Sequence, residues 1–133
     1  MSKCILIIAY LLYGEARGEG KLGINNVASV LMNSSRDNGL DRAFNLVYEA
    51  MKPGRYDSMK GLTADMIDIP KQNGAKDEQM WEYCISLATL MCKGEFEPIN
   101  NSNHFYNPKQ CSPSWGPKLQ DSFSIGRHVF GRL

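Results

Sequence analysis

The hydrophobic pattern begins with an uninterrupted apolar run. Residues 4–13 are apolar or aromatic at every position, and the run predicts a helix over residues 4–17. A helix that is apolar around its whole circumference has to be surrounded by other elements. The run is too short to cross a bilayer as a helix, so it predicts a core helix. A secretory signal peptide is the alternative, although no small-x-small cleavage site follows the run.

Three further stretches show helical spacing. Apolar residues recur at i, i+3, i+4 and i+7 in residues 21–33, and similar patterns predict helices over residues 40–51 and 75–93. Residues 53–74 carry scattered Gly, Pro and Asp and predict a loop. Beyond Pro98 the chain is irregular. The pattern therefore predicts a mainly α protein with a long C-terminal loop region and little β structure.

Length and charge narrow the range of functions. The chain has 133 residues, which predicts one domain over residues 1–133. Its net charge of +1 gives no electrostatic footprint for nucleic acid. The four cysteines stand outside any C-x-x-C pair, which argues against a metal site and favours reduced, mostly buried thiols. Residues 18–23 match G-x-G-x-x-G without directly following a strand, so no nucleotide cofactor is expected.

The end of the first helix carries the strongest candidate for catalysis. Glu15 follows the apolar run, where desolvation raises the pKa of a carboxyl group into the range that a general acid needs. A surface ion pair between Glu15 and Arg17 is the alternative. Glu19 lies at i+4 from Glu15, but Gly18 and Gly20 interrupt the helix. We therefore expect Glu19 to support the turn, through backbone N–H groups or an arginine.

A second group of candidates lies near the C-terminus. Residues 104–108 are His, Phe, Tyr, Asn and Pro, and aromatic faces and amide groups suit sugar rings and their hydroxyl and acetamido groups. Within this stretch Phe105 is expected to be a buried anchor. Trp115 is either a sugar platform or a core residue, whereas Trp81 lies on the apolar face of a helix and is expected in the core. His128 is interpreted as a local hydrogen-bonding residue.

These motifs together resemble a known family, the SleB-like cell wall hydrolases of spore-cortex-lytic enzymes and some phage endolysins. The resemblance extends over most of the chain. It is carried, in chain order, by Tyr13–Glu19, Asn25–Asn33, His104–Pro108, Ser114–Trp115 and Ile125–Phe130. It implies a lysozyme-like, mostly helical fold. It also implies cleavage of peptidoglycan between N-acetylmuramic acid and N-acetylglucosamine by a lytic transglycosylase mechanism with a 1,6-anhydro product.

Residue by residue, the resemblance makes Glu15 the catalytic glutamate. It places Tyr106 and Asn107 in the substrate-side loop, with His104 at the first position of that loop. The nearest counterpart of a Gln-Phe-Ser-like stretch in the family is residues 54–58, where Ser58 stands for the serine as a further substrate-binding residue and is offset by Asp57. The resemblance requires no cofactor and no metal ion.

Three alternatives remain open. A hydrolytic muramidase would use Glu15 and activate water through Asp57 or Glu19. A non-catalytic glycan-binding or virion module would keep the sugar-binding loop without turnover. A helical regulatory protein would show neither binding nor lysis, and Glu15 would be an ordinary exposed carboxylate.

The expected partners are the glycan strands of peptidoglycan, with no nucleic acid and no stable insertion in a membrane. A monomer is expected. A catalytic domain with no evident wall-binding module or export signal resembles a phage endolysin. Such a protein waits in the host cytoplasm until the inner membrane is breached and then acts on the wall in the periplasm.

Overall fold

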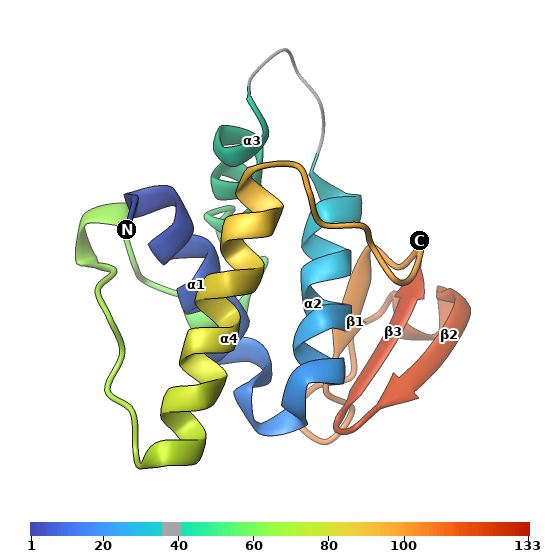
Figure 1. The fold of residues 1–133 in the computed structure, drawn as a ribbon. Coiled ribbons are helices and arrows are strands. Elements are labelled where there is room, and N and C mark those ends of the chain that lie inside the picture. Colours follow the sequence, from blue (N-terminus) through green and yellow to red (C-terminus); the bar gives the residue numbers. More distant parts are fainter. Residues whose placement is uncertain (36–40) are drawn as a thin grey trace.

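The computed structural model describes residues 1–35 and 41–133 (Figure 1). Within these ranges the helices are α1 (Lys3–Ala16), α2 (Gly20–Ser34), α3 (Arg42–Ala50) and α4 (Ala75–Cys92). The strands are β1 (His104–Tyr106), β2 (Gln120–Ile125) and β3 (His128–Arg132), and short 3₁₀ turns include Arg17–Glu19 and Asp57–Met59. The mainly helical class is confirmed. Residue 40, the predicted start of the third helix, lies outside the described residues.

Helix α1 lies at the centre of the helical part of the molecule. The Ser2 side chain caps its start by accepting a hydrogen bond of 3.2 Å from the Ile5 backbone N–H. Its central side chains are fully buried, and it packs against α2, α3 and α4 (Figure 1). The interpretation of the first apolar run as a core helix is confirmed. In the described part of the chain, no helix is long and apolar enough to cross a membrane.

Helix α2 joins the helices to the sheet. It contacts α1 and α4 and also β1, which lies on its far side from α4 in Figure 1. Its buried residues include Ile24, Val27, Val30 and Leu31, each with no exposed surface.

The start of α3 is capped by Asp41, whose side chain accepts a 2.8 Å bond from the Phe44 N–H. Trp81 of α4 is 5% exposed, as expected for a core residue.

The C-terminal region corrects the expectation of an irregular chain beyond Pro98. Three antiparallel strands form a small sheet in the order β1-β3-β2. Phe130, in the central strand β3, is fully buried, and its ring packs on Phe105 and Phe123 at centroid distances of 5.5 and 5.4 Å. Phe105 packs against the core as expected, but it is half-buried rather than buried and also lines the groove. The residues between β1 and β2 remain mostly irregular, and they form one side of the groove described next.

Candidate active site

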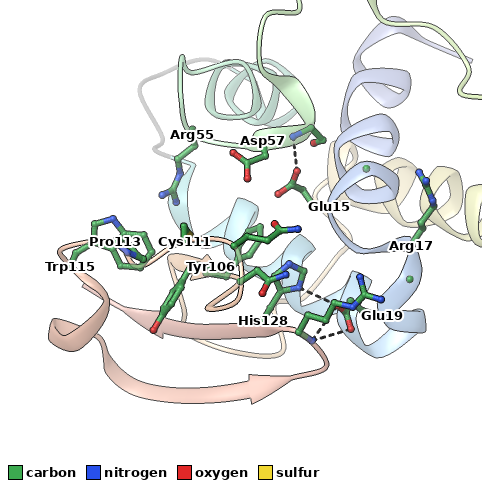
Figure 2. Close-up of a pocket in the computed structure, with 17 residues that line it drawn as sticks. Glu15, Arg17, Glu19, Arg55, Asp57, Tyr106, Cys111, Pro113, Trp115 and His128 are labelled. Carbon is green, nitrogen blue, oxygen red and sulfur yellow. Dashed lines mark hydrogen bonds and ion pairs between the residues drawn. The ribbon is translucent and has the colours of Figure 1, made fainter.

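A groove of about 600 Å³ opens where α1 ends against the loops around the sheet. Its first wall is the end of α1 with the 3₁₀ turn that follows, together with residues 55–58. Its second wall is formed by residues 105–107, 110, 111, 113 and 115. The turn between β2 and β3 closes one end (Figure 2). Segments that are far apart in the sequence therefore meet around Glu15.

Glu15 lies in the last turn of α1 and is half-buried, with its carboxylate directed into the groove (Figure 2). The backbone N–H of Ser58 donates a hydrogen bond of 2.8 Å to Glu15 Oε2. Burial raises the pKa of Glu15 above its ordinary value, and the negative charge of Asp57 adds to this rise. Hydrogen bonding from Ser58 acts in the opposite direction and lowers the pKa, but burial is the larger effect.

The approach of Ser58 to Glu15 depends on a glycine. A Cβ atom on Gly14 would lie 2.5 Å from the Ser58 Cβ, which is far inside van der Waals contact. Gly14 therefore lets residues 55–58 come close enough to reach Glu15. Arg17, the alternative partner of Glu15, instead pairs with Asp77 at 3.8 Å, and its guanidinium lies 4.7 Å from the centroid of the Tyr13 ring.

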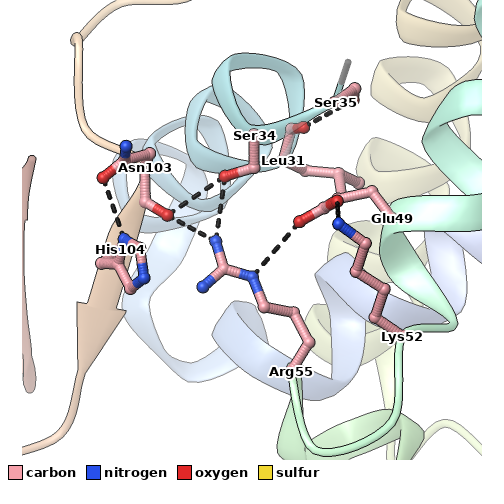
Figure 3. A network of polar contacts seen from close by, with 8 residues as sticks. All are labelled: Leu31, Ser34, Ser35, Glu49, Lys52, Arg55, Asn103 and His104. Carbon is pink, nitrogen blue, oxygen red and sulfur yellow. Dashed lines mark hydrogen bonds and ion pairs between the residues drawn. The ribbon is translucent and has the colours of Figure 1, made fainter. Parts of the chain in front are cut away.

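The loop that carries Ser58 is fixed at its other end by a polar network (Figure 3). Arg55 forms an ion pair of 3.3 Å with Glu49, which is 4% exposed. The same guanidinium donates to the Ser34 hydroxyl at 2.9 Å and to the Asn103 carbonyl. Lys52 also pairs with Glu49, at 2.7 Å. The network connects α2, α3 and the start of β1, and Arg55 itself lines the groove.

The opposite wall contains the predicted sugar-binding residues Tyr106 and Asn107. The Tyr106 and Trp115 rings meet edge to face at 5.5 Å. Trp115 lines the groove and lies outside the core cluster, so the alternative that it is a core residue is wrong. The Asn107 Oδ1 atom accepts a bond of 3.0 Å from the Lys109 N–H, so its NH₂ group is the part that can donate to a ligand.

His104 takes a different position from Tyr106. Its ring packs edge to face on Trp115 at 4.9 Å, and its Nδ1 atom lies 2.9 Å from Asn103 Oδ1. His104 is not one of the described residues that line the groove. This corrects the predicted substrate-binding role: His104 packs on Trp115 instead of lining the groove.

Glu19 supports a turn through a backbone N–H group, as expected, but this is the turn between β2 and β3 rather than the one at Gly18 and Gly20. Its carboxylate accepts the Arg127 backbone N–H, at 3.2 Å from both oxygens, and so holds the turn between β2 and β3. A Cβ on Gly126 would lie 1.7 Å from Glu19 Oε2, and Gly126 has a φ of +56°. The turn therefore requires glycine at this position.

Several groove residues were not identified from the sequence as ligand contacts. They are Arg55, Gln110, Cys111, Arg127 and His128. The Gly126-Arg127 pair between two strands was the one usable signal, because glycine at the first position of a two-residue turn is typical of a hairpin. In the part of the chain that the structure describes, no three His, Cys, Asp or Glu side chains gather in a way that could hold a metal ion.

Comparisons with known proteins identify the family and the fold of the chain. A family model described as Cell Wall Hydrolase matches residues 18–131, a range that begins after Glu15 and contains residues 55–58 and the second wall of the groove. The catalytic domain of the germination-specific lytic transglycosylase SleB from Bacillus anthracis shares the fold, with a TM-score of 0.63 and 21% identity over 99% of this chain and 96% of that chain. A comparison with curated protein sequences finds no significant match. The resemblance stated from the sequence motifs is confirmed, and the chain belongs to the cell wall hydrolase family of enzymes.

Proposed function

We propose that this enzyme is a lytic transglycosylase that cleaves the peptidoglycan glycan strand between N-acetylmuramic acid and N-acetylglucosamine. The observation that carries the proposal is the half-buried Glu15 carboxyl group. Its pKa is raised, and it lines the groove opposite the Tyr106–Asn107 wall. The SleB domain, which shares the fold, is itself described as a lytic transglycosylase.

The reaction needs one carboxyl group in two roles. Protonated Glu15 donates its proton to the glycosidic oxygen while the bond to C1 of the muramic residue breaks. The carboxylate that results then accepts the proton of the C6 hydroxyl, whose oxygen bonds to C1. The products are a 1,6-anhydro-muramic end and a free hydroxyl on the leaving sugar, and Glu15 ends the cycle protonated.

The remaining groove residues bind and orient the glycan in this proposal. Trp115 and Tyr106 offer aromatic surface to a sugar ring, and the Asn107 NH₂ group donates to a hydroxyl or acetamido oxygen. His104 acts through Trp115. Ser58 positions the Glu15 carboxyl group through the 2.8 Å bond from its backbone N–H.

A hydrolytic muramidase is the second candidate, and Asp57 favours it. Asp57 is exposed, lines the groove, and lies close enough to influence the charge of Glu15. A carboxylate in this position can accept a proton from a water molecule, whose oxygen then bonds to C1 in place of the C6 oxygen. The two mechanisms leave different ends on the glycan.

The test is a digest of purified peptidoglycan followed by mass spectrometry. Anhydro ends support the transglycosylase, and reducing ends, heavier by one water, support the muramidase. Glu15→Gln is expected to lower the rate at least about 10²-fold, the usual range for loss of a general acid. The control is Glu97→Gln, an exposed acid outside the groove. Wild-type rates in Glu15→Gln would reject both mechanisms, and no product from the wild-type protein would favour a glycan-binding module.

A role as a phage endolysin is a separate proposal about the biological setting. The protein would act as a monomer, held in the host cytoplasm until the inner membrane is breached. Expression in a bacterial host is expected to leave cells intact until a membrane-permeabilising agent is added, and then to lyse them. Lysis without that agent would reject the cytoplasmic setting, and sedimentation analysis tests the monomer.

A further inference from the structure

His128 is one of the groove residues that the proposed mechanism leaves unused. It is the first residue of β3, its side chain is 11% exposed, and it lines the groove. The ring meets Phe105 edge to face at 5.1 Å and Phe130 at 6.0 Å. Two aromatic rings thus fix the imidazole plane, so its two nitrogens face defined surroundings.

The two ring nitrogens differ in what they can bind. His128 Nδ1 is buried and has no hydrogen-bond partner, and Glu19 Oε1 lies 3.9 Å away. Glu19 is held in place by the Arg127 N–H and is itself 10% exposed. An Nδ1 lone pair would be repelled by the Glu19 carboxylate, whereas an Nδ1–H group is attracted to this carboxylate. The Nδ1–H tautomer is therefore favoured, and Nε2 keeps its lone pair.

We propose that His128 is a further substrate-binding residue, whose Nε2 accepts a hydrogen bond from a hydroxyl or amide N–H of the glycan, and that Glu19 is the positioning residue that selects this tautomer. The inference rests on the proposed function, because it assumes that the groove binds a peptidoglycan strand. In Figure 2 the His128 ring lies between Glu19 and the space below Glu15, where a bound sugar would pass.

Burial favours the neutral form of the ring. It lowers the pKa of His128, while the Glu19 charge raises this pKa and the Arg127 charge lowers it. Phe105 and Phe130 contribute no charge. A neutral ring is required here, because a doubly protonated imidazole has no acceptor nitrogen.

The first test is the tautomer, read from the ¹⁵N chemical shifts of the imidazole ring in the whole protein. The sequence has two histidines, so the His128→Phe spectrum identifies the signal. The Nδ1–H form is expected in the wild-type protein. In Glu19→Gln the amide oxygen can still accept the Arg127 N–H while its NH₂ faces Nδ1, which shifts the equilibrium toward Nε2–H. Glu97→Gln is the matched control and is expected to keep the wild-type tautomer. An Nε2–H ring in the wild-type protein would overturn the inference.

The second test is binding without turnover. His128→Phe, made in Glu15→Gln protein, is expected to weaken the binding of purified glycan fragments of peptidoglycan about tenfold, the usual effect of one lost hydrogen bond. An unchanged dissociation constant with a normally folded variant would overturn the inference. Product analysis of the wild-type enzyme is independent of this measurement, so failure of the proposed reaction is distinguishable from failure of His128.

Discussion

Two opposing effects act on the pKa of the Glu15 carboxyl group. The packed end of α1 removes water from around it and raises its pKa, while the bond from Ser58 favours its charged form. The apolar run before Glu15 made the first influence predictable from sequence. The second was not predictable, because Ser58 lies 43 residues away in the chain and reaches Glu15 only through folding.

Glu15→Gln is expected to stabilise the protein at neutral pH. Folding raises the pKa of the Glu15 carboxyl group, so the folded state holds the proton more tightly than the unfolded state. The protein therefore loses stability as the pH rises from the ordinary pKa of glutamate through the raised pKa. The amide avoids this cost and can still accept the Ser58 N–H. We expect a higher free energy of unfolding than that of the wild-type protein at pH 7, measured by urea denaturation. The gain should vanish below the ordinary pKa of glutamate, and a constant difference at all pH values would contradict the explanation.

Asp57→Asn is expected to change the pH profile of the enzyme. The Asp57 charge contributes to the raised pKa of Glu15, so its removal lowers that pKa. The alkaline limb of kcat/KM, which follows loss of the Glu15 proton, should move to lower pH. An unmoved limb would show that burial alone sets the titration. A loss of rate at all pH values would instead favour Asp57 as the base of a muramidase.

Helices and strands differ in how far the sequence predicted them. The helices were visible because apolar residues recur over several turns in residues 4–17, 21–33 and 75–93. The strands are short and half-exposed, and β2 has an irregular register between Gln120 and Phe123. Such strands lack the alternation that identifies a sheet from sequence. Because β1 and the β2–β3 turn carry groove residues, the arrangement of the second wall could not be predicted either.

The contact between α1 and the 55–58 loop gives a prediction about packing. Gly14→Ala places a methyl group against the Ser58 Cβ, although alanine suits a helix better than glycine. We expect a loss of about 1–3 kcal/mol in stability, the usual cost of overpacking, and a reduced cleavage rate as Ser58 moves away from Glu15. The double variant Gly14→Ala/Ser58→Gly removes the clash and keeps the Ser58 backbone N–H. It should recover most of the stability, and no recovery would place the strain elsewhere.

The molecule as a whole is a helical body with a small sheet attached, and the groove lies at their junction. Arg55 ties the two parts together, because it contacts Glu49 of α3, Ser34 of α2 and the Asn103 carbonyl just before β1 (Figure 3). No pattern in the sequence marks Glu49 as buried. Long-range polar networks of this kind depend on the packed structure, so the sequence predicted the helices but not how they hold the sheet.

Arg55→Met is expected to lower both stability and activity. It leaves the buried Glu49 with Lys52 as its remaining cation, and we expect a cost of about 2 kcal/mol in thermal or urea unfolding. Cleavage should slow because the 55–58 loop loses its anchor. Asp121→Asn is the control: its ion pair with Arg132 is exposed, and its loss should cost under about 0.5 kcal/mol. Equal effects in the two variants would contradict a special role for the network.

One of the two tryptophans is buried and the other lines the groove, so the fluorescence of the second can report binding in the groove. Trp81 is 5% exposed and packs on Tyr13, whereas Trp115 stands in the wall where a sugar ring would lie. Replacing Trp81 by phenylalanine leaves a single indole whose emission depends on what occupies the groove. Fluorescence titration of that variant with glycan fragments should follow binding directly, with no label attached.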